Sequence, residues 1–219
     1  VRETSLSPEH LICPVFVDEG DENQPISSLP GCTRWSVKGL VEEAKRLMDL
    51  GIRTLDLFPA IPDGKKTPDA CEACNPDGLI PRTIYALKSE VPGITVMTDV
   101  ALESAPKEGD KKTYQMDPGN IREALREAQL DEAEGADILM VKPATLYLDV
   151  MAAMRKHVTL PIAAYHVSGE YLMIKSAVAS GWLDERETVL ETLTSIRRAG
   201  ADMILTYYAP QAAEWLKQR

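Results

Sequence analysis

A repeating pattern of amphipathic helix, glycine and short apolar strand runs along the chain. It occurs over residues 41–60, 121–144 and 189–209. Apolar residues spaced three and four apart predict the helix in each repeat, and a short apolar run predicts a buried strand. Ser36 is the predicted N-cap of the first helix. The glycines that mark the helix ends are Gly51, Gly135 and Gly200.

Further segments extend the alternation. Apolar runs predict three more strands over residues 11–17, 94–101 and 161–167. Helices are predicted near residues 80–90, 147–157 and 170–180. Strands that alternate with helices favour right-handed βαβ units and a parallel sheet covered on both faces. Because no linker or composition shift interrupts the six predicted strands, we expect one α/β domain over residues 1–219.

Composition narrows the classes of partner. The 219 residues include 24 basic and 34 acidic side chains, a formal charge of −10, and no basic cluster. Nucleic acid and anionic membranes are therefore poor candidate partners. No apolar run approaches the roughly 20 residues of a membrane span, and residues 1–10 do not resemble a signal peptide. Four cysteines in a chain of this length do not form a disulfide framework, so we expect a cytoplasmic protein.

Polar side chains gather where four of the predicted strands end. They are Asp99, Lys142, Ser168 and the pair Tyr207 and Tyr208. Parallel α/β sheets carry their chemistry at the carboxyl ends of the strands. The convergence of these residues from separate strands therefore predicts a binding or catalytic site at that edge.

Lys142 is the sharpest single candidate. An amine held in apolar surroundings loses its proton more easily, because desolvation disfavours the charged form, and can then attack a ketone to give a Schiff base. A lysine that reaches solvent, or pairs with a carboxylate, is the structural alternative. Asp99 can equally cap the next loop, and Ser168 lies in a Ser-Gly sequence that is also common in turns.

Two other segments carry candidate ligands. Cys71 and Cys74 have the spacing of a metal-binding pair, but no second pair accompanies them, because Cys13 and Cys32 are isolated. A structural zinc site is therefore not expected. Residues 109–115 bring two lysines and a glutamine together, which suits an anionic substrate or a solvated loop.

Several long motifs together resemble one family. They are MVKPA (140–144), YHVSGEYLMIK (165–175), SIRRAGADMILTYYA (195–209), GDKKTYQMDP (109–118), ITVMTDVAL (94–102), PISSLPG (25–31) and LFPA (57–60). The chain thereby resembles the porphobilinogen synthase family, also called 5-aminolevulinate dehydratase, over essentially its whole length. The resemblance implies a TIM-barrel (β/α)8 fold. It also implies a lyase of heme and porphyrin biosynthesis that condenses two 5-aminolevulinate molecules into porphobilinogen with loss of two waters.

The resemblance also implies roles at the first substrate site. Lys142 matches the family lysine that forms a Schiff base with the first 5-aminolevulinate. Ser168 and Tyr207 match the residues that hold the carboxylate of that molecule, and Asp99 matches an acid that lines the site.

Roles beyond that site follow in the same way. Lys111 and Gln115 match residues that bind the carboxylate of the second 5-aminolevulinate. Glu127 matches the ligand of an allosteric magnesium ion, and an ordinary exposed helix glutamate is its alternative. Family members assemble as homo-octamers, so a homo-oligomer is the expected state.

The chain also departs from the family. Only six of the eight βα units are evident, because Leu102 runs directly into Glu103 where family members insert two further units. One of those carries a second Schiff-base lysine, and an arginine for the second substrate also falls in the missing part. The catalytic zinc cysteines of some members are absent, with Ala101 at their first position, so catalytic zinc is not expected. The basic N-terminal arm used in octamer assembly is not evident, because the chain opens at VRETSLSP.

Three hypotheses follow. The first is a porphobilinogen synthase in which Lys142 attacks the ketone of 5-aminolevulinate. The second is a catalytically defective remnant of the family that binds ligand or pairs with other subunits. The third is an aldolase-type lyase, which also uses a lysine on a barrel strand. The lack of a glycine-rich phosphate loop argues against the third.

Overall fold

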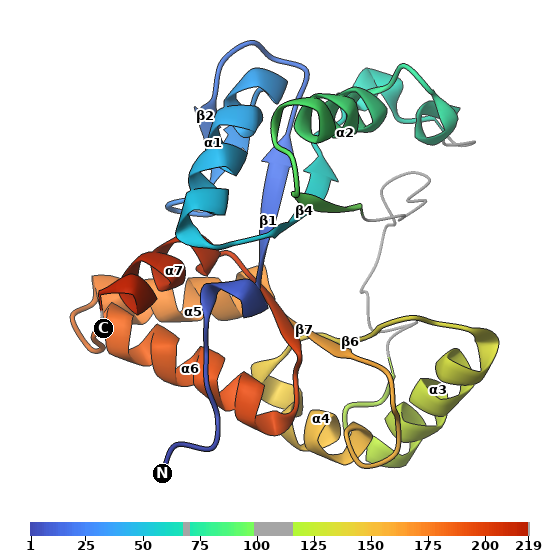
Figure 1. Cartoon of the computed structure of the whole chain (residues 1–219), viewed down its shortest axis with the longest axis vertical. Helices are drawn as coiled ribbons and strands as arrows, with labels where there is room; N and C mark the ends of the chain where they lie inside the picture. The colour runs from blue at the N-terminus through green and yellow to red at the C-terminus, as the bar shows by residue number, and fades with distance from the viewer. Residues whose placement is uncertain (68–70, 99–115, 219) are drawn as a thin grey trace. The chain divides into compact units, whose positions relative to one another are not determined.

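The computed structural model describes residues 1–67, 71–98 and 116–218 (Figure 1). The chain divides into two compact units. Unit 1 consists of Val1–Leu11 and Gly109–Tyr208, and unit 2 of Ile12–Glu108 and Ala209–Arg219. The expectation of a single domain over residues 1–219 is not tested by this division and stays a prediction.

Unit 2 is built on a parallel sheet. Its central strand β1 (Leu11–Val17) pairs in parallel with β4 (Thr54–Pro59), and β4 pairs in parallel with β5 (Thr95–Thr98). The short strand β3 (Thr33–Trp35) adds to the other side of β1, and β2 (Gln24–Pro25) pairs antiparallel with β3. The apolar runs of β1 and β4 are buried, as expected for strands that helices cover.

Three α-helices belong to unit 2: α1 (Val37–Leu50), α2 (Leu79–Glu90) and α7 (Ala209–Lys217). Helix α1 packs against both α2 and α7. The side chain of Ser36 accepts a hydrogen bond from the Gly39 N–H, which confirms the predicted N-cap. The buried face of α1 follows the spacing of its apolar residues, Leu40, Val41, Ala44 and Leu47.

Unit 1 contains three further parallel strands. Strands β6 (Leu139–Val141), β7 (Ile162–His166) and β8 (Met203–Thr206) pair in parallel in that order. Helices α3 (Ile121–Glu134), α4 (Leu148–Met154), α5 (Ser168–Ala179) and α6 (Glu185–Ala199) connect and cover these strands. Helix α6 packs against α4, α5 and β8, so it is the central helix of this layer.

The sequence-based expectations agree with these elements in outline. All six predicted strands are present, and the three glycines that end the repeated helices have φ of 93°, 100° and 120°, which only glycine adopts easily. Strands β2 and β3 and helix α7 were not predicted. No helix in the described part of the chain is long and apolar enough to cross a membrane.

Candidate active site

The three strands of unit 1 end at a common edge. The last pair between β6 and β7 is Val141↔Ala164, so Lys142 directly follows the end of β6 and Tyr165 lies one residue beyond that pair on β7. Lys142 and Tyr165 therefore lie at the carboxyl ends of neighbouring strands, where parallel α/β proteins hold their reacting groups.

Tyr207 joins this edge from the third strand. Its hydroxyl lies 3.0 Å from the hydroxyl of Tyr165, within hydrogen-bonding distance, and the centroids of the two rings are 6.3 Å apart. The ring of Tyr171 from α5 meets Tyr207 edge-on at 5.8 Å and is itself buried. The two hydroxyls are thus held together by packed rings at a half-buried position, where they can bind a carboxylate.

A buried carboxylate fixes the backbone around these residues. Glu170 accepts hydrogen bonds from the N–H groups of Ala144 at 3.2 Å, Thr145 at 2.6 Å and Val167 at 2.8 Å, and also from the hydroxyl of Thr145. Ala144 and Thr145 directly follow Lys142-Pro143, and Val167 directly precedes Ser168. Glu170 therefore ties the segment after β6 to the start of α5.

Ser168 is the first residue of α5 and is exposed. The first turn of a helix presents backbone N–H groups without helical partners and carries a partial positive charge. The hydroxyl of Ser168 at this position is suited to an anionic group such as a carboxylate. Of the residues predicted for the first substrate site, Lys142, Ser168 and Tyr207 thus follow the ends of three adjacent parallel strands.

The surroundings of Lys142 differ from expectation. Its side chain is exposed, and so is that of Met140, which projects from the same face of β6 with 43% of its surface accessible. Within the described residues β6 pairs only with β7, so no strand covers its other side. The expected apolar enclosure of this amine is therefore wrong for the described part of the chain, because no described strand pairs with the other side of β6.

His166 and Tyr208 lie behind the candidate site. The His166 ring is buried and its Nδ1 lies 3.1 Å from the Thr206 hydroxyl. Burial lowers the pKa of His166, and the nearby Glu170 carboxylate opposes part of this effect. The Tyr208 hydroxyl donates to Glu185 at 3.1 Å. Tyr208 was predicted to be a polar strand-end residue, but the structure places it in the packing of unit 1.

The remaining predicted site residues fall in two groups. Asp99, Lys111 and Gln115 lie outside the described residues. Glu127 lies on α3 and is exposed. Among residues 1–67, 71–98 and 116–218, no three His, Cys, Asp or Glu side chains are grouped closely enough to hold a metal ion. The described residues thus do not build a protein-enclosed magnesium site around Glu127.

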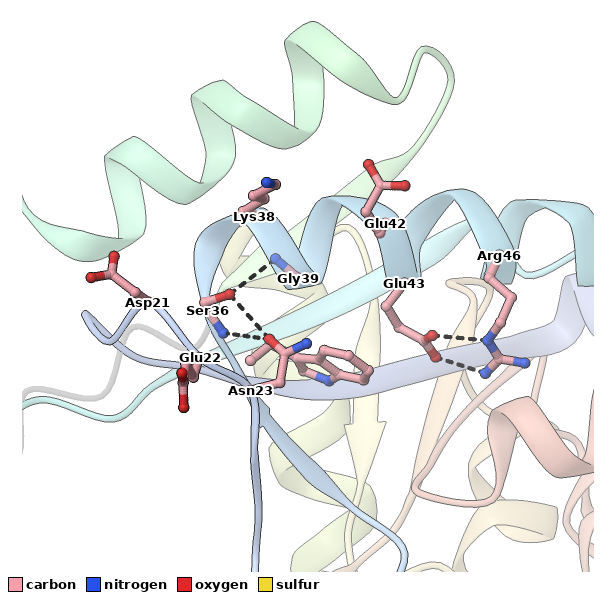
Figure 2. A pocket seen from close by; sticks show the side chains of 10 residues that line it. Asp21, Glu22, Asn23, Ser36, Lys38, Gly39, Glu42, Glu43 and Arg46 are labelled. Carbon is pink, nitrogen blue, oxygen red and sulfur yellow. Dashed lines mark hydrogen bonds and ion pairs between the residues drawn. The ribbon is translucent and has the colours of Figure 1, made fainter.

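Unit 2 has an open groove of about 730 Å³ beside the start of α1 (Figure 2). The side chain of Asn23 accepts hydrogen bonds from the N–H and hydroxyl of Ser36, and Glu43 pairs with Arg46 through two contacts of 2.7 and 2.8 Å. An added Cβ at Gly39 would lie 2.0 Å from Asn23 Oδ1, so a side chain there would displace the Asn23 amide from Ser36. None of the predicted site residues lines this groove.

Two residues of the candidate site were not predicted. Tyr165 lies inside an apolar strand, where its hydroxyl gives no sequence signal. Glu170 could have been found, because an acidic residue at the third position of a helix commonly accepts backbone N–H groups at the helix start.

A parallel α/β sheet with polar and reactive side chains at its carboxyl edge defines an enzyme-like protein of the TIM-barrel class. The sequence profile of delta-aminolevulinic acid dehydratase matches residues 1–104 and 101–215. The chain belongs to the delta-aminolevulinic acid dehydratase family, whose members are lyase-type enzymes also named porphobilinogen synthase. The predicted family and enzyme class are thereby confirmed.

Curated relatives match nearly the whole sequence of this chain. The chloroplastic delta-aminolevulinic acid dehydratase of Physcomitrium patens is 40% identical, with 98% of this chain and 70% of the relative covered. The chloroplastic enzyme of Chlamydomonas reinhardtii is 36% identical over 99% of this chain and 80% of its own length.

A solved structure also matches this chain closely. The crystal structure of the Toxoplasma gondii enzyme, in complex with the reaction product porphobilinogen, is 35% identical and matches with a TM-score of 0.95. The match covers 100% of this chain and 88% of that chain. This similarity confirms the TIM-barrel type of fold.

The comparisons also locate the shortened region. The alignment with the Physcomitrium enzyme spans 304 residues, whereas the chain has only 219, so at least 85 positions of the relative have no counterpart here. The two parts of the family profile meet at residues 101–104, at the predicted junction of Leu102 and Glu103. The relatives thus carry a long segment between β5 and β6, which explains the uncovered side of β6.

The expectation of a cytoplasmic protein is contradicted. The plant and algal relatives are named as chloroplastic enzymes, which points to a plastid. The overall composition could not have shown this, because globular proteins of different compartments have similar compositions.

Proposed function

We propose that the chain acts on 5-aminolevulinate, with Lys142 as the nucleophile of the first substrate site. The Lys142 amine attacks the ketone carbon, and loss of one water gives an imine between lysine and substrate. The Ser168 hydroxyl and the start of α5 bind the substrate carboxylate, together with the Tyr207 hydroxyl. Condensation with a second 5-aminolevulinate then gives porphobilinogen, with two waters lost in total.

The observation that carries this proposal is the common edge of β6, β7 and β8. Lys142 directly follows the end of β6, the Tyr165 hydroxyl lies 3.0 Å from that of Tyr207, and Ser168 follows the end of β7. A nucleophile and two carboxylate-binding hydroxyls therefore come from adjacent strands. The Glu170 carboxylate supports this arrangement by accepting four hydrogen bonds, from Ala144 and Thr145 after β6 and from Val167 before α5.

Porphobilinogen formation by the purified full chain tests the proposal. We expect turnover by the chain, its loss in Lys142→Ala, and its retention in Lys156→Ala, an exposed lysine of unit 1 away from the strand ends. Turnover that survives in Lys142→Ala would contradict the assignment of the nucleophile.

A second candidate function is a family remnant that binds 5-aminolevulinate without condensing it. The exposed position of Lys142 and the absence of at least 85 positions found in the relative favour it. Equilibrium binding of 5-aminolevulinate without any porphobilinogen would support the remnant. Turnover by the purified chain would exclude it.

Assembly and metal dependence belong to the same proposal. A homo-oligomer is expected from the family resemblance, and magnesium at the exposed Glu127 carboxylate would act through water ligands, since Mg²⁺ in proteins often binds to only one or two carboxylates. Glu127→Gln should abolish any increase of activity on addition of magnesium, while the activity without magnesium stays unchanged.

A further inference from the structure

Two exposed cysteines of unit 2 have no part in the proposed function. Cys71 and Cys74 are both exposed, carry free thiols, and form the first and last residues of the 3-10 helix η3 (Cys71–Cys74). This turn lies between the end of β4 and the start of α2. Neither cysteine belongs to a group of three potential metal ligands within the described ranges, so the metal-binding interpretation has no support there.

The geometry of a 3-10 helix brings the two side chains together. With three residues per turn, the side chains at positions i and i+3 project from the same side of the helix. A rise of about 2.0 Å per residue separates the Cα atoms of Cys71 and Cys74 by about 6 Å. Disulfides form between Cα atoms roughly 4.4–6.8 Å apart. The Cα atoms of the two cysteines in this turn therefore lie at a spacing that a disulfide can bridge.

The exposed Cys71 differs from the buried Cys13 in the reactivity expected of its thiol. Cys13 is buried in β1, and burial raises the pKa of its thiol far above the ordinary range, so it stays protonated and inert. Cys71 is accessible, and its sulfur lies 3.2 Å from the Thr67 hydroxyl, which can donate a hydrogen bond to a thiolate. Accessible thiols are the ones that take part in exchange reactions.

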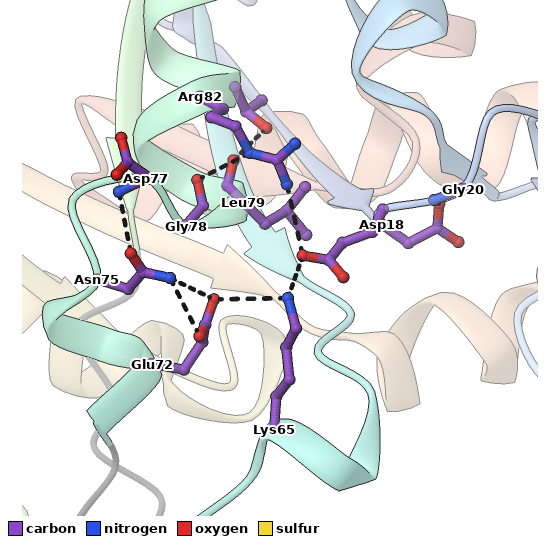
Figure 3. A network of polar contacts seen from close by, with 11 residues as sticks. Asp18, Gly20, Lys65, Glu72, Asn75, Asp77, Gly78, Leu79 and Arg82 are labelled. Atoms are coloured by element: carbon purple, nitrogen blue, oxygen red, sulfur yellow. Dashed lines mark hydrogen bonds and ion pairs between the residues drawn. The ribbon is translucent and has the colours of Figure 1, made fainter.

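The turn is also anchored on both sides. Glu72, between the two cysteines, accepts from the Asn75 side chain at 3.3 Å and lies 3.9 Å from the Lys65 ammonium (Figure 3). Lys65 in turn pairs with Glu19 at 2.6 Å. These contacts support the turn from outside the sulfur pair, so closing a bond between the thiols leaves them in place.

We propose that Cys71 and Cys74 form a redox-active dithiol that closes to an intramolecular disulfide by exchange with a small disulfide. The Cys71 thiolate attacks one sulfur of the small disulfide, which forms a mixed disulfide and releases one small thiol. The Cys74 thiolate then attacks the Cys71 sulfur and releases the second small thiol. The protein dithiol is oxidised by two electrons, and the small disulfide is reduced to two thiols.

Oxidised glutathione tests the proposal on the reduced full chain. After incubation, the remaining thiols are alkylated and the peptides are mapped by mass spectrometry. We expect a peptide holding Cys71 and Cys74 that has lost two hydrogen atoms and carries neither alkyl group nor glutathione. Cys13 should be alkylated only after denaturation. Stable glutathione adducts on both cysteines, or unmodified thiols, would overturn the proposal.

Variants separate the two steps. Cys74→Ser should stop at a stable glutathione adduct on Cys71, because the second thiol is missing. Cys32→Ser is the matched control and should form the internal disulfide as the unmodified chain does.

A second measurement is independent of oxidation. Phenylarsine oxide binds two neighbouring thiols through two As–S bonds and releases one water. We expect one arsenical per reduced chain, lost in both Cys71→Ser and Cys74→Ser. Equal binding by either variant would contradict the pairing of the thiols. Neither measurement depends on turnover of 5-aminolevulinate, so each stands apart from the proposed function.

Discussion

The carboxylate of Glu170 accepts a hydrogen bond from the backbone N–H of Ala144 at a distance of 3.2 Å. The two residues belong to different βα units, since Ala144 follows β6 and Glu170 lies in the first turn of α5. Through this contact the position of Lys142, two residues before Ala144, depends on the helix that begins with Ser168. Glu170 is thus a positioning residue that links Lys142, the candidate nucleophile, to Ser168, a candidate ligand of the substrate carboxylate.

Replacement of Glu170 by glutamine should weaken both the fold and the site. The amide has one acceptor oxygen and turns its NH2 group toward N–H donors, so at least one buried donor loses its partner. We expect the free energy of unfolding to fall by about 2 kcal/mol. In thermal denaturation this corresponds to a decrease in Tm of roughly 4–8 °C.

Glu187→Gln provides the matched control for that prediction. Glu187 is also the third residue of its helix, α6, but it is exposed. We expect its Tm to stay within about 2 °C of the unmodified chain, as for most surface substitutions. Equal losses in the two variants would contradict a special role for the buried carboxylate.

The hydrogen-bonded tyrosines allow a graded test of substrate binding. Tyr207→Phe removes a hydroxyl assigned to the substrate carboxylate, and we expect 5-aminolevulinate to bind about tenfold more weakly, the effect of losing one hydrogen bond to a charged group. Tyr165→Phe removes the hydroxyl that lies beside that of Tyr207, and a loss of about threefold is expected.

The double variant decides whether the two hydroxyls act together. If Tyr165 acts by orienting Tyr207, its substitution should add nothing once the Tyr207 hydroxyl is gone. Calorimetric Kd values for the two single variants and the double variant test this. Fully additive losses would show that the 3.0 Å contact plays no part in binding.

His166 predicts a pH dependence of stability. Its pKa is lowered in the folded chain, mainly by burial, so the unfolded chain takes up this proton first as the pH falls. The stabilisation is fully present above the unfolded pKa of about 6.5 and is lost as the pH falls below it. For one proton the slope is at most about 1.4 kcal/mol per pH unit.

His166→Gln should flatten this part of the stability curve. Urea denaturation between pH 7.5 and 5 compares the variant with the unmodified chain and with His157→Gln, an exposed histidine. We expect the curve of His157→Gln to follow that of the unmodified chain. If the free energy of unfolding of His166→Gln fell with pH as steeply as that of the unmodified chain and of His157→Gln, the His166 ring would not contribute to the pH dependence of stability.

How far the fold follows from sequence depends on the element. The buried strands β1, β4 and β7 were predictable, because continuous apolar runs between helices and glycines have few other interpretations. Strands β2 and β3 have only two and three residues, too few for any alternation to show.

The candidate site was predictable only in part. Lys142, Ser168 and Tyr207 stand out, because each follows an apolar run and matches a family motif. The contact of Tyr165 with Tyr207 joins residues 42 positions apart, and only tertiary packing brings them together. Lys142 is exposed beside a strand, β6, that pairs only with β7 among the described residues, and no local sequence pattern around residue 142 predicts this.

The central claim is that Lys142 forms an imine with 5-aminolevulinate, and borohydride trapping tests it most directly. Reduction converts the imine to a stable secondary amine, which peptide mapping by mass spectrometry locates. We expect one adduct, on the peptide that contains Lys142, which is absent in Lys142→Arg and present in Lys156→Arg. An adduct at another lysine, or no adduct while 5-aminolevulinate binds, would contradict the account.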